Sequence, residues 1–383
     1  MKLKIGLSIV VVWLGLTGAA AELCSENIEL LATLPVAAQG YEVTAWGTWA
    51  FVAAGPEGVL AVDLYWPGRP VRRGVQSDIG TAVDVLVRSL DEIYVLCRNV
   101  PPTGDPGLFI YRWNGVAGRF EQRSFAALPS GQQAETLDLQ HPKLNVTTRS
   151  LQGTSGLLIP VDVADPDHPD VGAGLNLRHP PLDSMKDNLL AYAAGGDKGF
   201  FVERLPGFPV PNWSNPDPRV DTPGSTNRVE RSGGLCYVTD GLGGLRVMST
   251  ADPHNPAEIG FYQLPGAFVA QAKDLVLDFP TAYIAYGYRG LQVIDVTTAT
   301  AMDRLAWVEP EALEYFVRAV ALLPDEDLIV FLSQDGMLGV VQYPRRPPTP
   351  TPAPDVNNDG YVDYQDLFLI HANWKESYPT PTP

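Results

Sequence analysis

The stretch "AYIAYGYRGLQVID" (282–295) holds two short apolar runs on either side of a turn that contains two glycines. The runs are rich in β-branched and aromatic residues, which is typical of β-strands bounded by Gly-containing turns. Without any gap, the same pattern occurs in "AFVAAGPEGVLAVD" (50–63), "AYAAGGDKGFFVER" (191–204) and "CYVTDGLGGLRVMS" (236–249). A pattern that recurs in this way predicts a repeated unit of strand, turn and strand.

Three further copies extend the repeat. The stretch "IVFLSQDGMLGVVQ" (329–342) aligns without a gap, although its Gly is shifted by one place to Gly336. The copy at 93–111 has six extra residues in its turn, and the copy at 144–163 has a degenerate turn before a clear second strand. The aligned turn positions, spaced 43 to 49 residues apart, are Gly58, Gly107, Gly156, Gly199, Gly244, Gly290 and Met337.

Seven units of about 46 residues therefore run from about residue 28 to residue 343. A period of this length is typical of propeller arrays, in which one blade is a four-stranded antiparallel sheet. The sequence thus predicts an all-β fold, a seven-bladed β-propeller. The 36 Gly and 35 Pro agree with this class, because both residues are costly inside helices.

The two ends of the repeat region predict how the ring closes. The seventh copy ends at Tyr343, after its third strand, while the N-terminal "NIELLATLP" (27–35) has the pattern of a fourth strand. The following "YEVTAW" (41–46) has the pattern of a first strand. We therefore expect Ile28–Thr33 to lie alongside Leu338–Tyr343 and to complete the last blade, because this pairing covers an edge that would otherwise stay open.

Two Asp-Pro-x-x-Pro segments, at 165–169 and 252–256, follow third strands. Pro cannot donate to a strand ladder and so ends the strand, while Asp can accept hydrogen bonds from the amides of the turn. These segments predict the corner between the third and fourth strands of a blade. We interpret Asp63, Asp162 and Asp295, which end third strands, as turn caps for the same reason.

The repeats at 290–295 (Gly-Leu-Gln-Val-Ile-Asp), 58–63 (Gly-Val-Leu-Ala-Val-Asp) and 244–248 (Gly-Leu-Arg-Val-Met), together with the Asp-Pro-x-x-Pro corners, resemble the LVIVD-repeat family of exported β-propellers. The resemblance covers the region that we assign to the propeller, 22–344. It implies repeated blades and secretion or display at the cell surface. It implies no reaction.

The first 21 residues have the pattern of a secretory signal peptide. Lys2 and Lys4 precede an apolar run at 5–16, and Ala19–Ala21 offers a small-residue cleavage site. No later stretch is long and apolar enough to predict a membrane span. We therefore expect cleavage after Ala21 and a protein that is secreted, extracellular or held at the cell surface.

The formal net charge of −17 at pH 7 argues against binding to nucleic acid, because an acidic chain repels the phosphate backbone. Three cysteines, Cys24, Cys97 and Cys236, are too few for a disulfide scaffold. Cys97 and Cys236 lie in apolar runs, which favours two buried thiols; one disulfide with a spare thiol is the alternative. We expect a monomeric propeller.

The tail combines proline-rich spacers with one acidic loop. A Pro/Thr linker at 345–354 and a Pro/Thr tail at 377–383 flank the segment 355–376. Oxygen donors fall at EF-hand loop positions 1, 3, 5, 7, 9 and 12 around Gly360, namely Asp355, Asn357, Asp359, Tyr361, Asp363 and Asp366. The spacing predicts a calcium loop followed by a short helix; the alternative is an acidic turn that binds no metal.

The tail sequence "DVNNDGYVDYQDLFLIHANW" (355–374) also resembles one half of a type I dockerin, the module that binds cohesin domains. A dockerin has two such halves, and one is seen in this sequence. A cohesin-like partner and a simple calcium-stiffened attachment unit therefore both remain open.

Three aspartates are candidates for catalysis or metal binding in the propeller. Asp84, Asp183 and Asp274 share one position in the strand that precedes the template, with Thr136 and Arg228 near it in other copies. One position repeated around a ring converges on the central channel, where paired carboxylates could bind a metal or perform acid–base chemistry. The alternative is that each Asp has the same structural role in its blade.

Aromatic residues and loops offer further binding candidates. Insertions at 98–107 and 204–227 are candidate ligand loops, because loops on a rigid propeller vary without harm to the core. The tryptophans that could stack on sugar rings are Trp46, Trp49, Trp66, Trp113 and Trp213, of which Trp46 and Trp49 could equally pack between blades.

Two functions follow from these observations. The first is a secreted binding or scaffold propeller for an unidentified protein or carbohydrate partner, with a calcium-binding tail for attachment. The alternative is an extracellular hydrolase or lyase that acts on polysaccharide or a lactone. Three or more carboxylates at one mouth of the channel would favour the enzyme, and a channel lined with apolar side chains would favour the scaffold.

Overall fold

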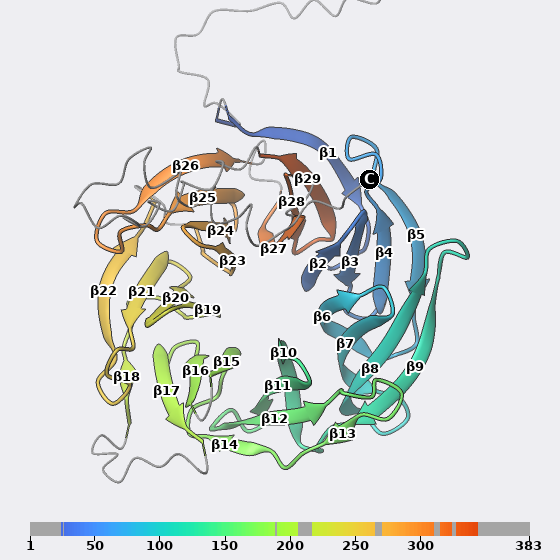
Figure 1. The fold of residues 1–383 in the computed structure, drawn as a ribbon, viewed down its shortest axis with the longest axis horizontal. Coiled ribbons are helices and arrows are strands. Elements are labelled where there is room, and N and C mark those ends of the chain that lie inside the picture. The colour runs from blue at the N-terminus through green and yellow to red at the C-terminus, as the bar shows by residue number, and fades with distance from the viewer. Residues whose placement is uncertain are drawn as a thin grey trace, which may run out of the picture.

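The computed structural model describes residues 24–25, 27–187, 190–205, 217–264, 270–309, 315–323 and 327–343. In this part of the chain, seven antiparallel sheets stand around a common centre, as the ring in Figure 1 shows. The all-β, seven-bladed propeller that the repeat predicts is confirmed. The segments 1–21 and 345–383, which include the expected signal peptide and calcium loop-helix, lie outside the described residues.

Six blades contribute their strands in chain order, from the centre of the ring outward. The first three blades are β2 (Glu42–Trp46), β3 (Trp49–Ala53), β4 (Val59–Asp63) and β5 (Val71–Gln76); β6 (Thr81–Ser89), β7 (Glu92–Val100), β8 (Asp105–Asn114) and β9 (Arg119–Ala127); and β10 (Gln132–Gln140), β11 (Lys143–Ser150), β12 (Gly156–Asp162), β13 (Asp170–Val171) and β14 (Leu175–Leu177).

The next three blades are β15 (Asp183–Asp187), β16 (Leu190–Ala194), β17 (Phe200–Arg204) and β18 (Arg219–Val220); β19 (Arg228–Ser232), β20 (Leu235–Thr239), β21 (Leu245–Ser249) and β22 (Ala257–Tyr262); and β23 (Asp274–Asp278), β24 (Thr281–Ala285), β25 (Leu291–Asp295) and β26 (Asp303–Val308). The seventh blade joins β27 (Val317–Leu323), β28 (Leu328–Ser333) and β29 (Met337–Gln342) to β1 (Glu29–Pro35).

The N-terminal strand closes the ring as the sequence predicts. β1 pairs antiparallel with β29, with Leu30 opposite Val341 and Thr33 opposite Gly339. In Figure 1, β1 lies along the outside of β29, so the last blade contains both ends of the repeat region. The edge of β29 is thereby covered, and no blade of the described chain depends on another molecule for its fourth strand.

The first Gly of each Gly-x-x-Gly turn ties its blade to the next. Reciprocal backbone hydrogen bonds of 2.9–3.1 Å join Gly55 to Ala82, Gly196 to Thr226, Gly241 to Ala272 and Gly287 to Val317. All four glycines have φ between +52° and +60°, a region that L side chains rarely adopt. The turn of the repeat is therefore also a contact between blades.

The second Gly of the turn has a different role. A Cβ atom on Gly58, Gly199, Gly244 or Gly336 would fall against the carbonyl oxygen of Gln76, Val220, Tyr262 or Ala37, respectively. The first three carbonyls belong to the last residue of the fourth strand in the same blade. In the seventh blade, the carbonyl belongs to a residue just after β1. Gly336, shifted by one place in the sequence, thus performs the same task as its counterparts.

The corners between third and fourth strands have the expected caps. Asp63, Asp162 and Asp295 each accept a hydrogen bond of 2.9 Å from the amide two residues ahead. In the Asp-Pro-x-x-Pro corners, Asp165 and Asp252 accept the same kind of bond at 3.0 Å. Pro ends the strand and Asp satisfies the amide that follows it.

The apolar core lies between neighbouring blades, not in the channel. Between the first two blades, for example, Phe51 of β3 packs with Val95 and Trp113 of the second blade. The cysteines are free, and Cys97 and Cys236 are buried, so two buried thiols are confirmed over a disulfide.

We expect Gly244→Ala to destabilise the propeller more than Gly233→Ala. Both glycines have positive φ, at 84° and 59°, so both substitutions carry a backbone cost of about 1–2 kcal/mol. The new methyl group also meets the Tyr262 carbonyl at position 244, whereas it meets nothing within 4 Å at position 233. Urea unfolding of the two variants measures the difference, for which we expect about 1–3 kcal/mol. Equal losses would contradict the close approach between turn and fourth strand.

Candidate functional site

Four inner strands carry an ionisable residue at one register. These residues, which pair with Ala53, Ala194, Thr239 and Ala285 of the second strands, are Glu42, Asp183, Arg228 and Asp274. Asp84 on β6 also lies near this level, opposite Leu96. The inner strands face the centre of the ring (Figure 1), so we infer that this register gathers the five side chains in the channel.

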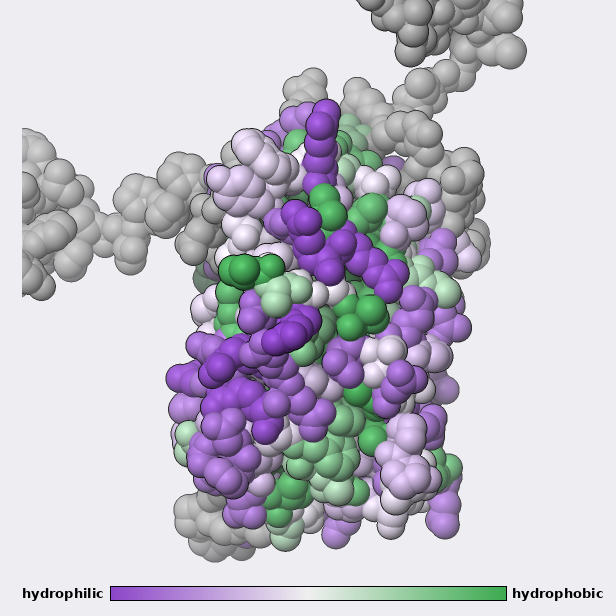
Figure 2. All heavy atoms as spheres, turned by 90° about the vertical axis from the view of Figure 1, so that its right-hand side faces the viewer, coloured by the Kyte–Doolittle hydropathy of each residue, from purple (hydrophilic) through white to green (hydrophobic). Residues whose placement is uncertain are grey.

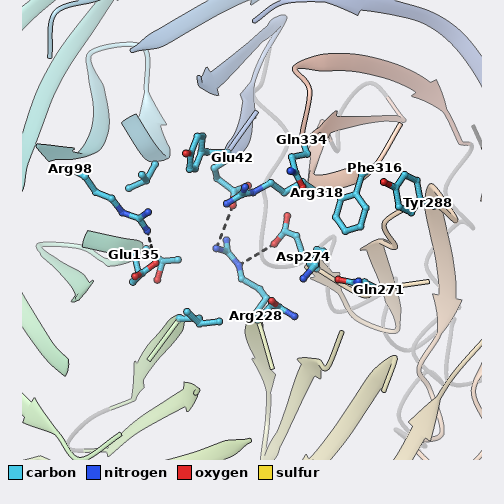
Figure 3. A pocket seen from close by; sticks show the side chains of 16 residues that line it. Glu42, Arg98, Glu135, Arg228, Gln271, Asp274, Tyr288, Phe316, Arg318 and Gln334 are labelled. Atoms are coloured by element: carbon cyan, nitrogen blue, oxygen red, sulfur yellow. Dashed lines mark hydrogen bonds and ion pairs between the residues drawn. The ribbon is translucent and has the colours of Figure 1, made fainter. Parts of the chain in front are cut away.

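Arg228 lies at the centre of the carboxylates. Its guanidinium Nε is 3.3 Å from Asp274 Oδ1 and 3.9 Å from Asp183 Oδ2. Its Nη1 is 3.7 Å from Glu42 Oε2, on a strand across the ring, and Figure 3 shows the side chain reaching between Glu42 and Asp274. We call Arg228, Glu42, Asp84, Asp183 and Asp274 the central cluster.

The three predicted aspartates also fasten neighbouring blades together. Their Oδ2 atoms accept backbone hydrogen bonds from the next inner strand, Asp84 from Leu137 (2.6 Å), Asp183 from Val229 (2.9 Å) and Asp274 from Val320 (2.8 Å). Thr136 donates to the second oxygen of Asp183 at 2.7 Å. The structural role that we weighed against catalysis is therefore present in all three blades.

In the central cluster, burial raises the pKa values of Glu42, Asp84 and Asp274 and so favours the protonated form of these three carboxyls. Burial raises the pKa of Asp84 from its ordinary 3.8 to about 6, against the opposing effect of Arg228. Burial and the charge of Asp274 hold the pKa of Glu42 well above its ordinary range. For the Arg228 guanidinium, burial lowers the pKa but the surrounding carboxylates more than offset this, so the cation stays charged.

These raised pKa values give the central cluster a defined pH dependence. A carboxyl whose folded pKa exceeds its unfolded pKa binds more protons in the folded state. Its stabilising contribution is full below the unfolded value of about 4 and is lost as the pH rises through the folded value. For Asp84 the window therefore runs from about 4 to about 6.

The central cluster separates two chambers of the channel. Where the inner strands begin, a polar chamber of about 520 Å³ is lined by charged, amide and aromatic side chains, including Arg98, Lys273 and Arg318. Where the inner strands end, an apolar chamber of about 460 Å³ is lined mainly by side chains such as Val85 and Leu277. Glu42 and Arg228 line both, so their ion pair lies where the chambers meet.

The carboxylates of the polar chamber already have cationic partners. Glu135 forms ion pairs with Arg98 (2.6 Å, Figure 3) and with Arg149 (3.0 Å). Glu42 and Asp274 face Arg228, as described above. The polar chamber thus contains three carboxylates, Glu42, Glu135 and Asp274, which is the number that we expected of an enzyme. Each of them, however, faces an arginine. Within the described residues, no group of three or more His, Cys, Asp or Glu side chains is arranged to hold a metal ion.

The other candidates from the sequence are dispersed. Trp113 is buried and stacks edge-on against Trp49 of the first blade at 5.1 Å, which is packing between blades. Trp46 and Trp66 are exposed, and Trp66 contacts Tyr65 at 5.2 Å on the outside of a corner. Trp213 and the rest of residues 206–216 in the insertion 204–227, like the calcium ligands of the tail, lie outside the described residues.

The outer surface of the ring offers no broad apolar area in the view of Figure 2, which shows the side that carries β5 and β9. Hydrophobic residues there form small groups among hydrophilic ones, with Val71, Val75 and Phe125 exposed. The described residues include no helix that is long and apolar enough to cross a membrane. The polar chamber, by contrast, gathers charged, amide and aromatic side chains from different blades around one space.

Sequence reasoning missed Glu42 and the central position of Arg228. A signal for both is present: Glu42, Asp183, Arg228 and Asp274 each stand 13 residues before the first Gly of a Gly-x-x-Gly turn, at Gly55, Gly196, Gly241 and Gly287. Alignment on this Gly, instead of on the preceding apolar run, would have placed all four in one column.

We expect Arg228→Met to cost about 3–5 kcal/mol of unfolding free energy near pH 8, because it leaves buried carboxylates without their cation. The cost should shrink toward about pH 4, where those carboxyls are protonated in the folded protein. Urea unfolding at both pH values measures this. Arg73→Met, which removes an exposed pair with Asp63, is the control and should cost less than about 1 kcal/mol. A pH-independent cost at position 228 would contradict the assignment.

The fold is similar to that of solved structures, whereas two comparisons of the sequence give no match. A scan against protein-family models gives no match, and a search of curated proteins also gives none. The crystal structure of the WD40 beta propeller domain of Doa1 superposes with a TM-score of 0.59 at 9% sequence identity, over 84% of this chain and 99% of that one. At this identity the likeness shows the β-propeller fold, and nothing beyond it.

Proposed function

We propose that this chain is a binding module that takes its ligand at the polar chamber, and that the central cluster holds the ring together without performing chemistry. The observation that carries the proposal is the engagement of the three aspartates. Each holds an amide of the next blade, and Asp183 and Asp274 also face Arg228. A carboxylate bound in this way is poorly placed to take up and release protons in a reaction cycle.

The position of the polar chamber supports the proposal. It opens where seven inner strands begin, so side chains from different blades surround one space of about 520 Å³. This volume is within the range of small-molecule sites. A rigid ring that presents varied loops around such a chamber suits binding, because the loops can change without loss of the core.

An enzyme is the second candidate, and one observation favours it. Burial raises the pKa of Asp84 to about 6 and that of Glu230 to about 7, values that suit a general acid at neutral pH. A hydrolase or lyase acting on polysaccharide or a lactone would use such groups. The pairing of the neighbouring carboxylates with Arg228 argues for the binding module instead.

We further propose that the protein is exported and that its tail binds calcium. The signal-like segment 1–21 and the resemblance to LVIVD-repeat propellers support export. The acidic loop with Asp355, Asp359 and Asp366 supports a calcium-stabilised unit for attachment or for a cohesin-like partner. The Pro/Thr linker at 345–354 would hold this unit apart from the propeller.

We expect no turnover when the chain is incubated with a panel of polysaccharides and lactones. Release of reducing ends or opening of the lactone is measured against a blank without protein. Asp84→Asn is the matched control, because an amide oxygen can still accept the Leu137 hydrogen bond. Turnover by the folded wild type that disappears in folded Asp84→Asn would replace the binding module with the enzyme.

We expect the full chain to bind one calcium ion, with a Kd on the order of 10⁻⁴–10⁻³ M. Calorimetric titration measures it. The double variant Asp355→Ala, Asp359→Ala removes two ligands and should abolish the heat signal, while Asp170→Ala, an exposed acid on β13, should leave it unchanged. Equal calcium binding by the double variant and the wild type would refute the tail site.

A further inference from the structure

We propose that the polar chamber binds an acidic sugar, that is, a sugar ring that carries a carboxylate. The proposal rests on the binding function above and specifies its ligand. It starts from an imbalance in the chamber: the carboxylates that line it have arginine partners, whereas two of its cations, Lys273 and Arg318, do not have carboxylate partners among the described residues.

Both unpaired cations lie against aromatic rings. The Arg318 guanidinium lies over the Tyr41 ring, 4.5 Å from its centroid, and no hydrogen bond from this guanidinium to another described residue is found. Lys273 Nζ lies 5.9 Å from the centroid of Phe316. Stacking fixes the plane of a guanidinium and leaves its N–H edge available for bidentate bonds to a carboxylate.

Electrostatics supports an anion between these two groups. Burial lowers the pKa of Lys273, and the positive charge of Arg318 lowers it further. Two cations that repel each other in a partly dry chamber are stabilised when a carboxylate enters. The whole chain is acidic, with a formal net charge of −17 at pH 7, so this local excess of positive charge is distinctive.

The remaining lining fits the sugar ring. Tyr288 and Phe316 stack edge-on at 5.1 Å beside the cations and offer apolar surface to the C–H face of a ring (Figure 3). Gln271 and Gln334, on the same side of the chamber, carry amides that can both donate to and accept from hydroxyls. A simple anion would contact only the two cations. An acidic sugar would also contact the aromatic rings and the amides, so this lining favours the acidic sugar.

The test is calorimetric titration of the full chain with trigalacturonate, and with glucuronate and mannuronate oligomers in parallel. We expect at least one of these to bind, with an affinity that falls as salt is added. Arg318→Gln should weaken binding at least tenfold, as expected for loss of a charged hydrogen bond of about 1.5–3 kcal/mol. Arg318→Lys should recover part of the affinity, and Lys273→Met should weaken it independently.

The matched control is Arg69→Gln, because Arg69 is a cation beside the exposed ring of Trp66 on another face. This variant should bind like the wild type. Thermal unfolding checks that each variant is folded. Galactose oligomers test the need for the carboxylate, while acetate and inorganic phosphate test the need for the sugar; all three should bind at least tenfold more weakly.

The outcomes separate this proposal from the binding function. Equal affinity of wild type and folded Arg318→Gln would place the ligand elsewhere and overturn the chamber assignment. Equal binding of phosphate or of neutral sugars, or no binding of any acidic sugar, would overturn the ligand class. Cleavage of an oligomer by the chain would instead overturn the proposal that the propeller is a non-catalytic module.

Discussion

A ring of sheets depends on the contacts between neighbouring blades, and here these contacts begin with a pair of backbone hydrogen bonds. Gly55 bridges to Ala82, Gly196 to Thr226 and Gly241 to Ala272. The central cluster residue of the next blade stands two places after each bridge, at Asp84, Arg228 and Asp274. The bridge therefore sets the height of each inner strand, and with it the level at which charged side chains meet in the channel.

The buried carboxylates at this level of the channel would destabilise the fold without Arg228. Carboxylates gathered in a partly dry channel repel one another, and the cost of burying them is large unless each finds a cation or a hydrogen-bond donor. Arg228 provides the cation, while the amides of Leu137, Val229 and Val320 provide donors. The same arrangement divides the channel, because the pair of Arg228 with Glu42 joins strands from opposite sides of the ring. This ion pair therefore lies where the polar and the apolar chambers meet.

The fold was predictable from the sequence, and the central site was predictable in part. Three patterns can be recognised in the sequence alone: the period near 46 residues, the Gly-containing turns and the strand-like N-terminal stretch. They gave the blade count, the closure by β1 and the capped corners. The column of Asp84, Asp183 and Asp274 was visible for the same reason, since a repeat preserves register.

The role of Arg228 was not visible in this way. The repeat places Arg228 in the same column as Glu42, Asp183 and Asp274, but the contact between Arg228 and Glu42, which are distant in sequence, joins strands across the ring. No periodic pattern encodes such a contact, because it depends on the angle through which seven blades close. The same holds for Lys273 and Arg318: a sequence shows two basic residues, but their lack of carboxylate partners follows from where all the acids lie. The insertions at 98–107 and 204–227 and the tail could be recognised in the sequence, but the repeat does not determine which residues they contact.

The closure by β1 has a consequence for how the protein comes into being. The partner of Glu29 is Gln342, so about 300 residues must be synthesised before this first strand can find its sheet. Six blades can assemble from neighbouring segments, whereas the seventh requires the loop that spans the whole ring to close. Until then, the outer edge of β29 stays uncovered and β1 has no partner strand. A chain that crosses a membrane before folding would complete its circle on the far side, in one late step.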